Sequence, residues 1–315
     1  MNHRNFGRRR VHRAFYTLLI WIADLIEDSL GLFRDLRPHH MPSDAAEWST
    51  EDLLKKVEQA PELEEALDRP ADATLLKLDD ATICKIVRED ADEVESYNEV
   101  LSMRCAYEQT TIPIPRLYRA TDVPGCSDGF LVMDYIPGDR LSLAWPKLSV
   151  WTKLRVAWTL RSYVRQLRRI RHPRAAVPGP LGPGLTPRRC AGNTLASVGK
   201  FGPFADAQEL TAAVNKECSS YQGVPTPREF AETEPLVFTH NDLYMGNVIL
   251  GRDGRVWLID WQFSGFYPRS FEFTTAVLMS ESSFYTLAPL SWRRCLPFIA
   301  DPYFERYRWL NGYAS

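Results

Sequence analysis

Residues 238–261 read FTHNDLYMGNVILGRDGRVWLIDW and are the most informative part of the sequence. Two apolar runs, NVIL and RVWLID, flank an Asp-Gly pair at 253–254, which is typical of a hairpin turn. We therefore predict two antiparallel strands with a loop on each side. Asp242 and Asn247 precede the first strand and Asp260 ends the second, so pairing of the strands brings three polar side chains to one end of the hairpin.

This combination of carboxylates and an amide suits phosphoryl transfer. Moving a phosphoryl group from a nucleotide to a hydroxyl requires Mg²⁺ held by hard oxygen ligands, and a carboxylate that orients the acceptor and takes its proton. One aspartate, an asparagine five residues later and a second aspartate after the hairpin supply these groups. The apolar flanks would hold them rigidly, as catalysis by positioning demands.

The motif His240-x-Asp242-x-x-x-x-Asn247, followed by Leu-Ile-Asp-Trp at 258–261, resembles the catalytic loop and metal-binding aspartate of the aminoglycoside phosphotransferase and choline kinase group. These enzymes are small-molecule relatives of the protein kinases. The resemblance covers roughly residues 70–280, where TICKIV resembles the strand with the phosphate-binding lysine and GFLVMDYIPGDRL resembles the hinge. It implies an α+β, two-lobed protein kinase-like fold, with a small N-terminal lobe of antiparallel sheet and one helix, and a larger, mainly helical C-terminal lobe.

Carried over residue by residue, the resemblance implies a role for each polar side chain. Asp242 would be the catalytic base that orients the substrate hydroxyl. Asn247 and Asp260 would bind Mg²⁺, while Lys85 would contact the phosphates of ATP and pair with Glu99.

The resemblance also places the adenine of ATP at the hinge between the lobes. An exposed strand edge offers the N–H and C=O groups that the edge of a purine requires. The hinge residues are Met133, Asp134, Tyr135 and Ile136. His240 is expected to brace its loop rather than to do chemistry, Trp261 to pack, and Asp139 and Arg140 to lie on the surface.

Alternatives remain for two of these residues. An alternating strand places a lysine on a solvated face more often than in a site, and Lys77 lies on the preceding run. Glu99 competes with Glu93 and Glu95, and only its spacing to the Ile-Pro pair that follows the helix selects it. Residues 69–85 contain no glycine, so the glycine-rich phosphate loop of protein kinases is missing.

Three functions follow from these patterns. The leading one is an ATP-dependent phosphotransferase that moves the γ-phosphoryl group to a hydroxyl of a small molecule. A second is a catalytically silent kinase-like binding protein, because fold does not ensure activity. A third, a true protein kinase, is disfavoured because no activation segment or Ala-Pro-Glu follows the Ile-Asp-Trp motif. Aminoglycoside and choline acceptors are not distinguished, because acidic and aromatic residues are both abundant in the C-terminal half.

Periodicity predicts the remaining elements. We expect a strand hairpin at 73–87, a helix at 91–109, a strand at 129–138 and a long helix at 150–171 with one buried stripe and arginines opposite. Residues 173–205 are rich in Pro and Gly and should be irregular.

The domain boundaries follow from this order of elements. Residues 1–45 would be an amphipathic extension, 46–137 the N-lobe and 138–315 the C-lobe. STEDLLKKVEQA should form a helix capped by Ser49 or Thr50.

The N-terminal extension begins with five arginines among its first 13 residues, followed by the apolar run AFYTLLIWIA. Asp24, Glu27 and Asp28 interrupt the apolar pattern, which continues at helical spacing, so the segment is too short to span a membrane. We predict a docking helix, with an organelle-targeting segment as the alternative.

Composition narrows the class of protein further. The chain has 315 residues, and its 38 basic residues nearly balance 40 acidic ones, so nucleic acid is not an expected partner. Six cysteines without paired spacing argue against a zinc site or a disulfide framework and favour a cytoplasmic location. The oligomeric state is not predictable from these features.

Overall fold

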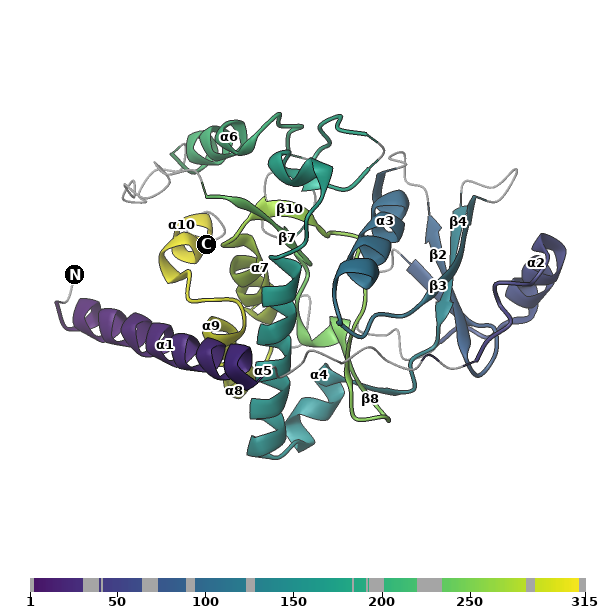
Figure 1. Ribbon diagram of the computed structural model, residues 1–315, viewed down its shortest axis with the longest axis horizontal. Coiled ribbons are helices and arrows are strands. Elements are labelled where there is room, and N and C mark those ends of the chain that lie inside the picture. The colour runs from purple at the N-terminus through teal and green to yellow at the C-terminus, as the bar shows by residue number, and fades with distance from the viewer. Residues whose placement is uncertain are drawn as a thin grey trace.

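The computed structural model describes residues 3–30, 40, 42–63, 73–88, 94–122, 128–182, 184–190, 192, 201–219, 234–281 and 287–311. Figure 1 shows two lobes: a sheet with helices α2 and α3 at one end, and a larger, mainly helical part at the other.

The smaller lobe is built on a four-stranded antiparallel sheet in the order β1-β2-β4-β3. Its strands are β1 (Ala73–Lys77), β2 (Thr82–Arg88), β3 (Leu117–Asp122) and β4 (Asp128–Asp134), and helix α3 (Val94–Gln109) follows β2. The predicted hairpin is confirmed, and its turn is closed by the Asp79 carboxylate, which accepts a hydrogen bond from the backbone N–H of Ala81 at 2.8 Å. The strand expected to reach residue 138 ends at Asp134, since the chain leaves the ladder before Pro137.

A second helix covers part of this sheet. Helix α2 (Thr50–Gln59) has Ser49 as its N-cap, which accepts a hydrogen bond from the Asp52 N–H. Its Leu53 is buried in a cluster with Leu76, Cys84 and other sheet residues. The predicted helix is therefore confirmed, and its apolar face explains how it is held on the sheet.

The larger lobe consists mostly of helices. They are α4 (Leu141–Ala144), α5 (Val150–Leu167), α6 (Ala207–Ser219), α7 (Phe271–Glu281), α8 (Leu290–Arg293), α9 (Leu296–Ile299) and α10 (Phe304–Asn311). Short 3₁₀ turns lie at Trp145–Lys147, Pro173–Ala176 and Met245–Asn247. Helix α5 begins at Ser149, whose side chain accepts from the Thr152 N–H, and it crosses the centre of the lobe in Figure 1. The stripe predicted at Leu154, Ala157, Leu160, Val164 and Leu167 is buried except at Leu154, which is exposed. Arg161, expected on an exposed face, is buried as well.

Two small antiparallel sheets complete the larger lobe. One contains β5 (Gly138–Arg140), β8 (Val248–Gly251) and β9 (Val256–Leu258), and the other contains β6 (Gly179–Pro180), β10 (Gly265–Pro268) and β7 (Leu236–Thr239). Pairing of β8 with β9 confirms the predicted hairpin, and Gly254 has φ +77°, as its turn requires. Strand β5 approaches β8 so closely that a Cβ on Gly138 would lie 2.4 Å from the Leu250 carbonyl oxygen. The expectation that Arg140 lies on the surface is wrong, because β5 turns its side chain inward and only 8% of it is exposed.

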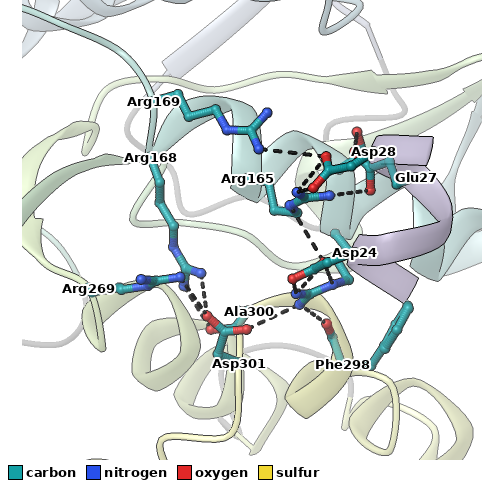
Figure 2. A network of polar contacts seen from close by, with 12 residues as sticks. Asp24, Glu27, Asp28, Arg165, Arg168, Arg169, Arg269, Phe298, Ala300 and Asp301 are labelled. Atoms are coloured by element: carbon teal, nitrogen blue, oxygen red, sulfur yellow. Dashed lines mark hydrogen bonds and ion pairs between the residues drawn. The ribbon is translucent and has the colours of Figure 1, made fainter. Parts of the chain in front are cut away.

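The predicted N-terminal helix, α1 (His3–Leu30), docks on the outside of the larger lobe (Figure 1). Figure 2 shows how acidic residues of α1 meet arginines of α5, with Glu27 and Asp28 beside Arg165. Arg161 of α5 also forms a two-pronged contact with Asp24 at 2.8–3.0 Å. None of the described helices combines the length and apolarity that crossing a bilayer needs.

Candidate active site

The loop between β7 and β8, residues 240–247, forms the first half of the candidate site. Asn247 donates from Nδ2 to the backbone oxygen of Asp242 at 3.0 Å and to its carboxylate Oδ2 at 2.7 Å. Both side chains are buried, and this bond fixes the direction of the Asp242 carboxylate. The other amide oxygen, Asn247 Oδ1, is buried and has no hydrogen-bond partner.

The second half of the site begins where β9 ends. The Ile259 N–H donates to the backbone oxygen of Asn247 at 3.1 Å, which places Asp260 beside the 240–247 loop. Asp260 has φ +67°, a left-handed conformation that aspartate tolerates better than most residues. The hairpin therefore carries Asp242, Asn247 and Asp260 to one end, as expected from its strand register.

Asp260 is joined to the smaller lobe by an ion-pair network. Lys85 on β2 donates to the Glu99 carboxylate of α3 at 2.6 Å and to the Asp260 carboxylate at 2.9 Å. Only 4% of the Lys85 side chain and 3% of the Glu99 side chain are exposed. The solvated alternative for Lys85 does not hold, whereas Lys77 pairs with the exposed Asp80 near the turn.

The charges of this network do not cancel. Two carboxylates share one ammonium group, so the three side chains sum to about one negative charge when all are ionised. Asp260 is the most exposed of the three, with 11% of its side chain exposed. Glu93 lies outside the described residues, and the side chain of Glu95 lies outside them as well.

A cleft between the lobes opens onto this network. Its lining includes Lys85, Glu99 and Asp260, the hinge residues Met133, Asp134, Tyr135 and Ile136, and apolar side chains such as Leu75, Ile83, Ile249 and Ile259. Asp242 and Asn247 are not among the residues that line it. The cleft thus combines apolar walls with a charged end, as a nucleotide site requires.

The hinge residues differ in what they can offer a ligand. The N–H of Tyr135 donates to Ala81 at 2.8 Å, and that of Asp134 donates to Arg116 at 3.1 Å. The Asp134 carboxylate is also engaged: it accepts from the Arg116 N–H at 2.7 Å and from the Tyr118 hydroxyl. No backbone hydrogen bond within the described part of the chain uses the N–H of Ile136, and Ile136 lines the cleft.

His240 is fully buried, and burial lowers its pKa to about 4 in spite of the nearby Asp260 charge. The imidazole is therefore neutral at pH 7, and Nε2 carries the proton because it contacts the Ile259 carbonyl oxygen at 3.0 Å, which can only accept. The ring packs edge-on against Trp261, with centroids 4.7 Å apart. These contacts indicate that His240 braces the loop rather than transferring a proton. Trp261 is a buried packing residue, as predicted.

Glu272, at the start of α7, is a site residue that the sequence did not reveal. Its carboxylate oxygens accept the backbone N–H groups of His240 at 2.8 Å and Asn241 at 3.2 Å. Burial raises its pKa to about 7, while the two N–H groups and Arg168 oppose this shift. Its one sequence signal is an acidic residue placed between two phenylalanines at the start of α7.

Asn98, one residue before Glu99 on α3, is a second missed residue. It donates from Nδ2 to the backbone oxygens of Gln262 at 2.6 Å and Ser264 at 2.9 Å, and its Oδ1 accepts from the Leu181 N–H at 2.7 Å. This fully buried amide ties α3 to the segment that follows Asp260. It therefore helps to set the distance between α3 and Asp260.

A divalent cation fits the oxygens gathered at this end of the hairpin. The unpartnered Asn247 Oδ1 and the Asp260 carboxylate are hard oxygen donors of the kind that Mg²⁺ prefers. No group of three or more His, Cys, Asp or Glu side chains arranged to hold a metal occurs among the described residues. Mg²⁺ needs no such group, because it keeps several waters and takes further ligands from phosphates.

Comparison with known proteins gives a family match. A model of the phosphotransferase enzyme family matches residues 68–310 of the chain. No curated protein sequence matches it.

Solved structures share the fold at low identity. The aminoglycoside phosphotransferase APH(2″)-IIa, in a ternary complex with streptomycin and ATP, is 15% identical, with 86% of each chain covered and a TM-score of 0.52. The choline kinase LicA from Streptococcus pneumoniae is 13% identical, with 84% of this chain and 86% of that chain covered and a TM-score of 0.50. These likenesses confirm the predicted two-lobed, protein kinase-like fold.

Proposed function

Because the chain belongs to the phosphotransferase enzyme family, we propose that it transfers the γ-phosphoryl group of ATP to a hydroxyl group of a small molecule. The observation that carries the proposal is a set of three neighbouring features. An interlobe cleft ends at the Lys85, Glu99 and Asp260 network, and the Asp242 and Asn247 pair lies at the same end of the β8–β9 hairpin as Asp260.

The cleft would bind the nucleotide with its base at the hinge and its phosphates at Lys85. The N–H of Ile136 and the apolar walls suit a purine edge and its faces. Lys85 would release part of its contact with the two carboxylates to meet the phosphates, as its ammonium carries three donors. One similar solved structure holds ATP, and another, at 11% identity and a TM-score of 0.51, holds GDP with kanamycin.

Asp242 would act as the base. As the acceptor oxygen forms its bond to the γ-phosphorus, the hydroxyl proton passes to the Asp242 carboxylate, and the bond between the γ-phosphorus and the bridging oxygen breaks to leave ADP. Asn247 holds the carboxylate in place through its 2.7 Å bond. Mg²⁺, held by Asp260 and Asn247 Oδ1, would neutralise charge on the phosphates.

The first experiment measures thermal stability with Mg²⁺ and ATP. We expect wild type to gain about 2.7 kcal/mol at a ligand concentration about 100 times its Kd. Asp260→Ala should lose most of this gain, whereas Asp139→Ala, which removes an exposed carboxylate on the neighbouring strand β5, should keep it. Equal responses of wild type and Asp260→Ala would remove Asp260 as the metal ligand.

The second experiment measures phosphoryl transfer to aminoglycosides, choline-type amino alcohols and a protein substrate, with ATP and with GTP. Asp242→Ala should lower the rate by a factor of about 100 or more, because general base catalysis typically contributes this much. Transfer that survives this substitution would exclude Asp242 as the base. Nucleotide binding without transfer to any acceptor would identify a catalytically silent binding protein instead.

A further inference from the structure

Helix α1 turns its apolar side away from the protein. Six large apolar side chains on its outer side are exposed: Phe15, Leu18, Leu19, Trp21, Ile22 and Leu25. Helices on the surface of a soluble protein usually place such a stripe against the core. We refer to these six residues as the outer face of α1.

The inner side of the helix is held by polar contacts instead. Asp24 meets Arg161, whose side chain is only 3% exposed. Arg165 pairs with Glu27 at 3.0 Å and with Asp28 at 2.9 Å (Figure 2). Glu27 is itself buried and accepts from the Ser162 hydroxyl at 2.9 Å. These contacts fix the rotation of the helix, because turning the outer face inward would leave buried arginines without their partners.

A further contact anchors the middle of the helix. The Tyr16 hydroxyl donates to the Arg294 carbonyl oxygen at 2.9 Å, and its ring lies against Phe304. Ala23 is buried at the interface with the lobe. The outer face is therefore displayed by a helix that is attached at several points between Tyr16 and Asp28.

The charge of the helix indicates what covers this face. The first 23 residues of the chain contain five arginines and no acidic residue. Arg4 and Arg8 precede Phe15 by 11 and seven residues, a spacing of about three and two turns of the helix. Arginines beside an apolar stripe with Trp and Phe are the pattern of helices that lie in the interface of an anionic membrane.

We propose that the outer face of α1 docks the protein on an anionic lipid surface, with the helix lying in the plane of the interface. The apolar side chains would enter the boundary between headgroups and acyl chains, and the arginines would contact the headgroups. A second copy of the chain fits the face less well, since two such helices would bring like charges together.

The test is a vesicle cosedimentation assay with the full chain. One set of vesicles contains phosphatidylcholine with phosphatidylserine, and the other contains phosphatidylcholine alone. The double variant Trp21→Glu/Leu25→Glu removes the outer face, and Trp151→Glu/Leu154→Glu is the matched control, because it replaces two exposed residues of the same types on α5. A third variant, Arg4→Gln/Arg8→Gln, alters charge alone.

We expect binding to the anionic vesicles, weakened about a hundredfold or more in the outer-face variant, because each lost side chain contributes about 1.5–3 kcal/mol of burial. The arginine variant should bind about fivefold more weakly per arginine removed. The α5 control should bind as wild type does, and thermal unfolding should show that all variants fold.

Three results would overturn the proposal. The first is no binding of wild type to anionic vesicles. The second is equal loss of binding in the α5 control. The third is a dimer, detected by light scattering, that the outer-face variant dissociates, which would assign the face to a second copy of the chain.

Discussion

Replacing Glu272 by glutamine tests how the 240–247 loop is held. The Glu272 carboxyl is 1% exposed and accepts two backbone N–H groups. Burial raises its pKa from the ordinary value of 4.5 to about 7, so the folded state binds a proton that the unfolded state releases between these pH values. The stabilisation from this group is therefore complete below about pH 4.5 and is lost as the pH rises through about 7.

The size of the effect follows from the two pKa values. At 1.36 kcal/mol per pH unit of pKa difference, wild type should lose about 2–3 kcal/mol relative to Glu272→Gln between pH 5 and pH 8. Glutamine has nearly the same shape and cannot ionise. Urea unfolding of both proteins at each pH measures the difference, and the comparison cancels the other groups that titrate in this range.

Glu272→Ala is the companion variant. It leaves the N–H groups of His240 and Asn241 without their acceptor, and each unsatisfied buried group costs about 1–3 kcal/mol. Alanine should therefore destabilise the protein at both pH values and lower the transfer rate by displacing the loop. A free-energy difference between wild type and Glu272→Gln that does not change with pH would refute this account of the buried carboxyl.

Three further changes test other contacts. Asp24→Ala leaves the buried Arg161 with only its contacts in the 298–301 segment. This change should lower the free energy of unfolding, measured in urea, by about 1–3 kcal/mol, whereas Asp139→Ala should leave that free energy unchanged. Gly138→Ala should destabilise by about 1–3 kcal/mol because its Cβ would overlap the Leu250 carbonyl; wild-type stability would contradict the close approach of β5 to β8. Burial raises the pKa of the Cys84 thiol to about 12, so alkylation by iodoacetamide at pH 8 should require denaturant, and rapid labelling of the folded protein would show that the sheet opens.

Local patterns predicted those parts of the fold that depend on neighbouring residues. The Asp-Gly turn at 253–254 lies between two short apolar runs, and the register that follows fixes where Asp242, Asn247 and Asp260 are placed. Helix α1 was also predictable, because its apolar residues continue at helical spacing on both sides of the acidic residues that interrupt them. In these cases the residues that predict the structure lie close in the sequence to the turn or helix that they form.

The residues that sequence reasoning missed act over long separations. Asn98 contacts residues 164 and 166 positions later, and Glu272 accepts from a loop about 30 residues earlier. A buried polar side chain gives no periodic signal for such contacts, and Arg161 and Arg140 look like surface residues until the elements that cover them are known. The roles proposed for Lys85, Glu99, Asp242, Asn247, Asp260 and the hinge stay predictions until the variants are measured.

The attachment of α1 has a consequence for biosynthesis. The Tyr16 hydroxyl bonds to a carbonyl 278 residues further along the chain, so this partner leaves the ribosome long after the helix itself. At the usual rates of translation the helix waits roughly 15–60 s for its binding surface. Its acidic residues meet the arginines of α5 earlier, because these partners follow 137 residues later in the chain. Until then, a chaperone or the surface that its outer face recognises is the first partner it can find. Docking of α1 then marks the completion of the C-terminal helices.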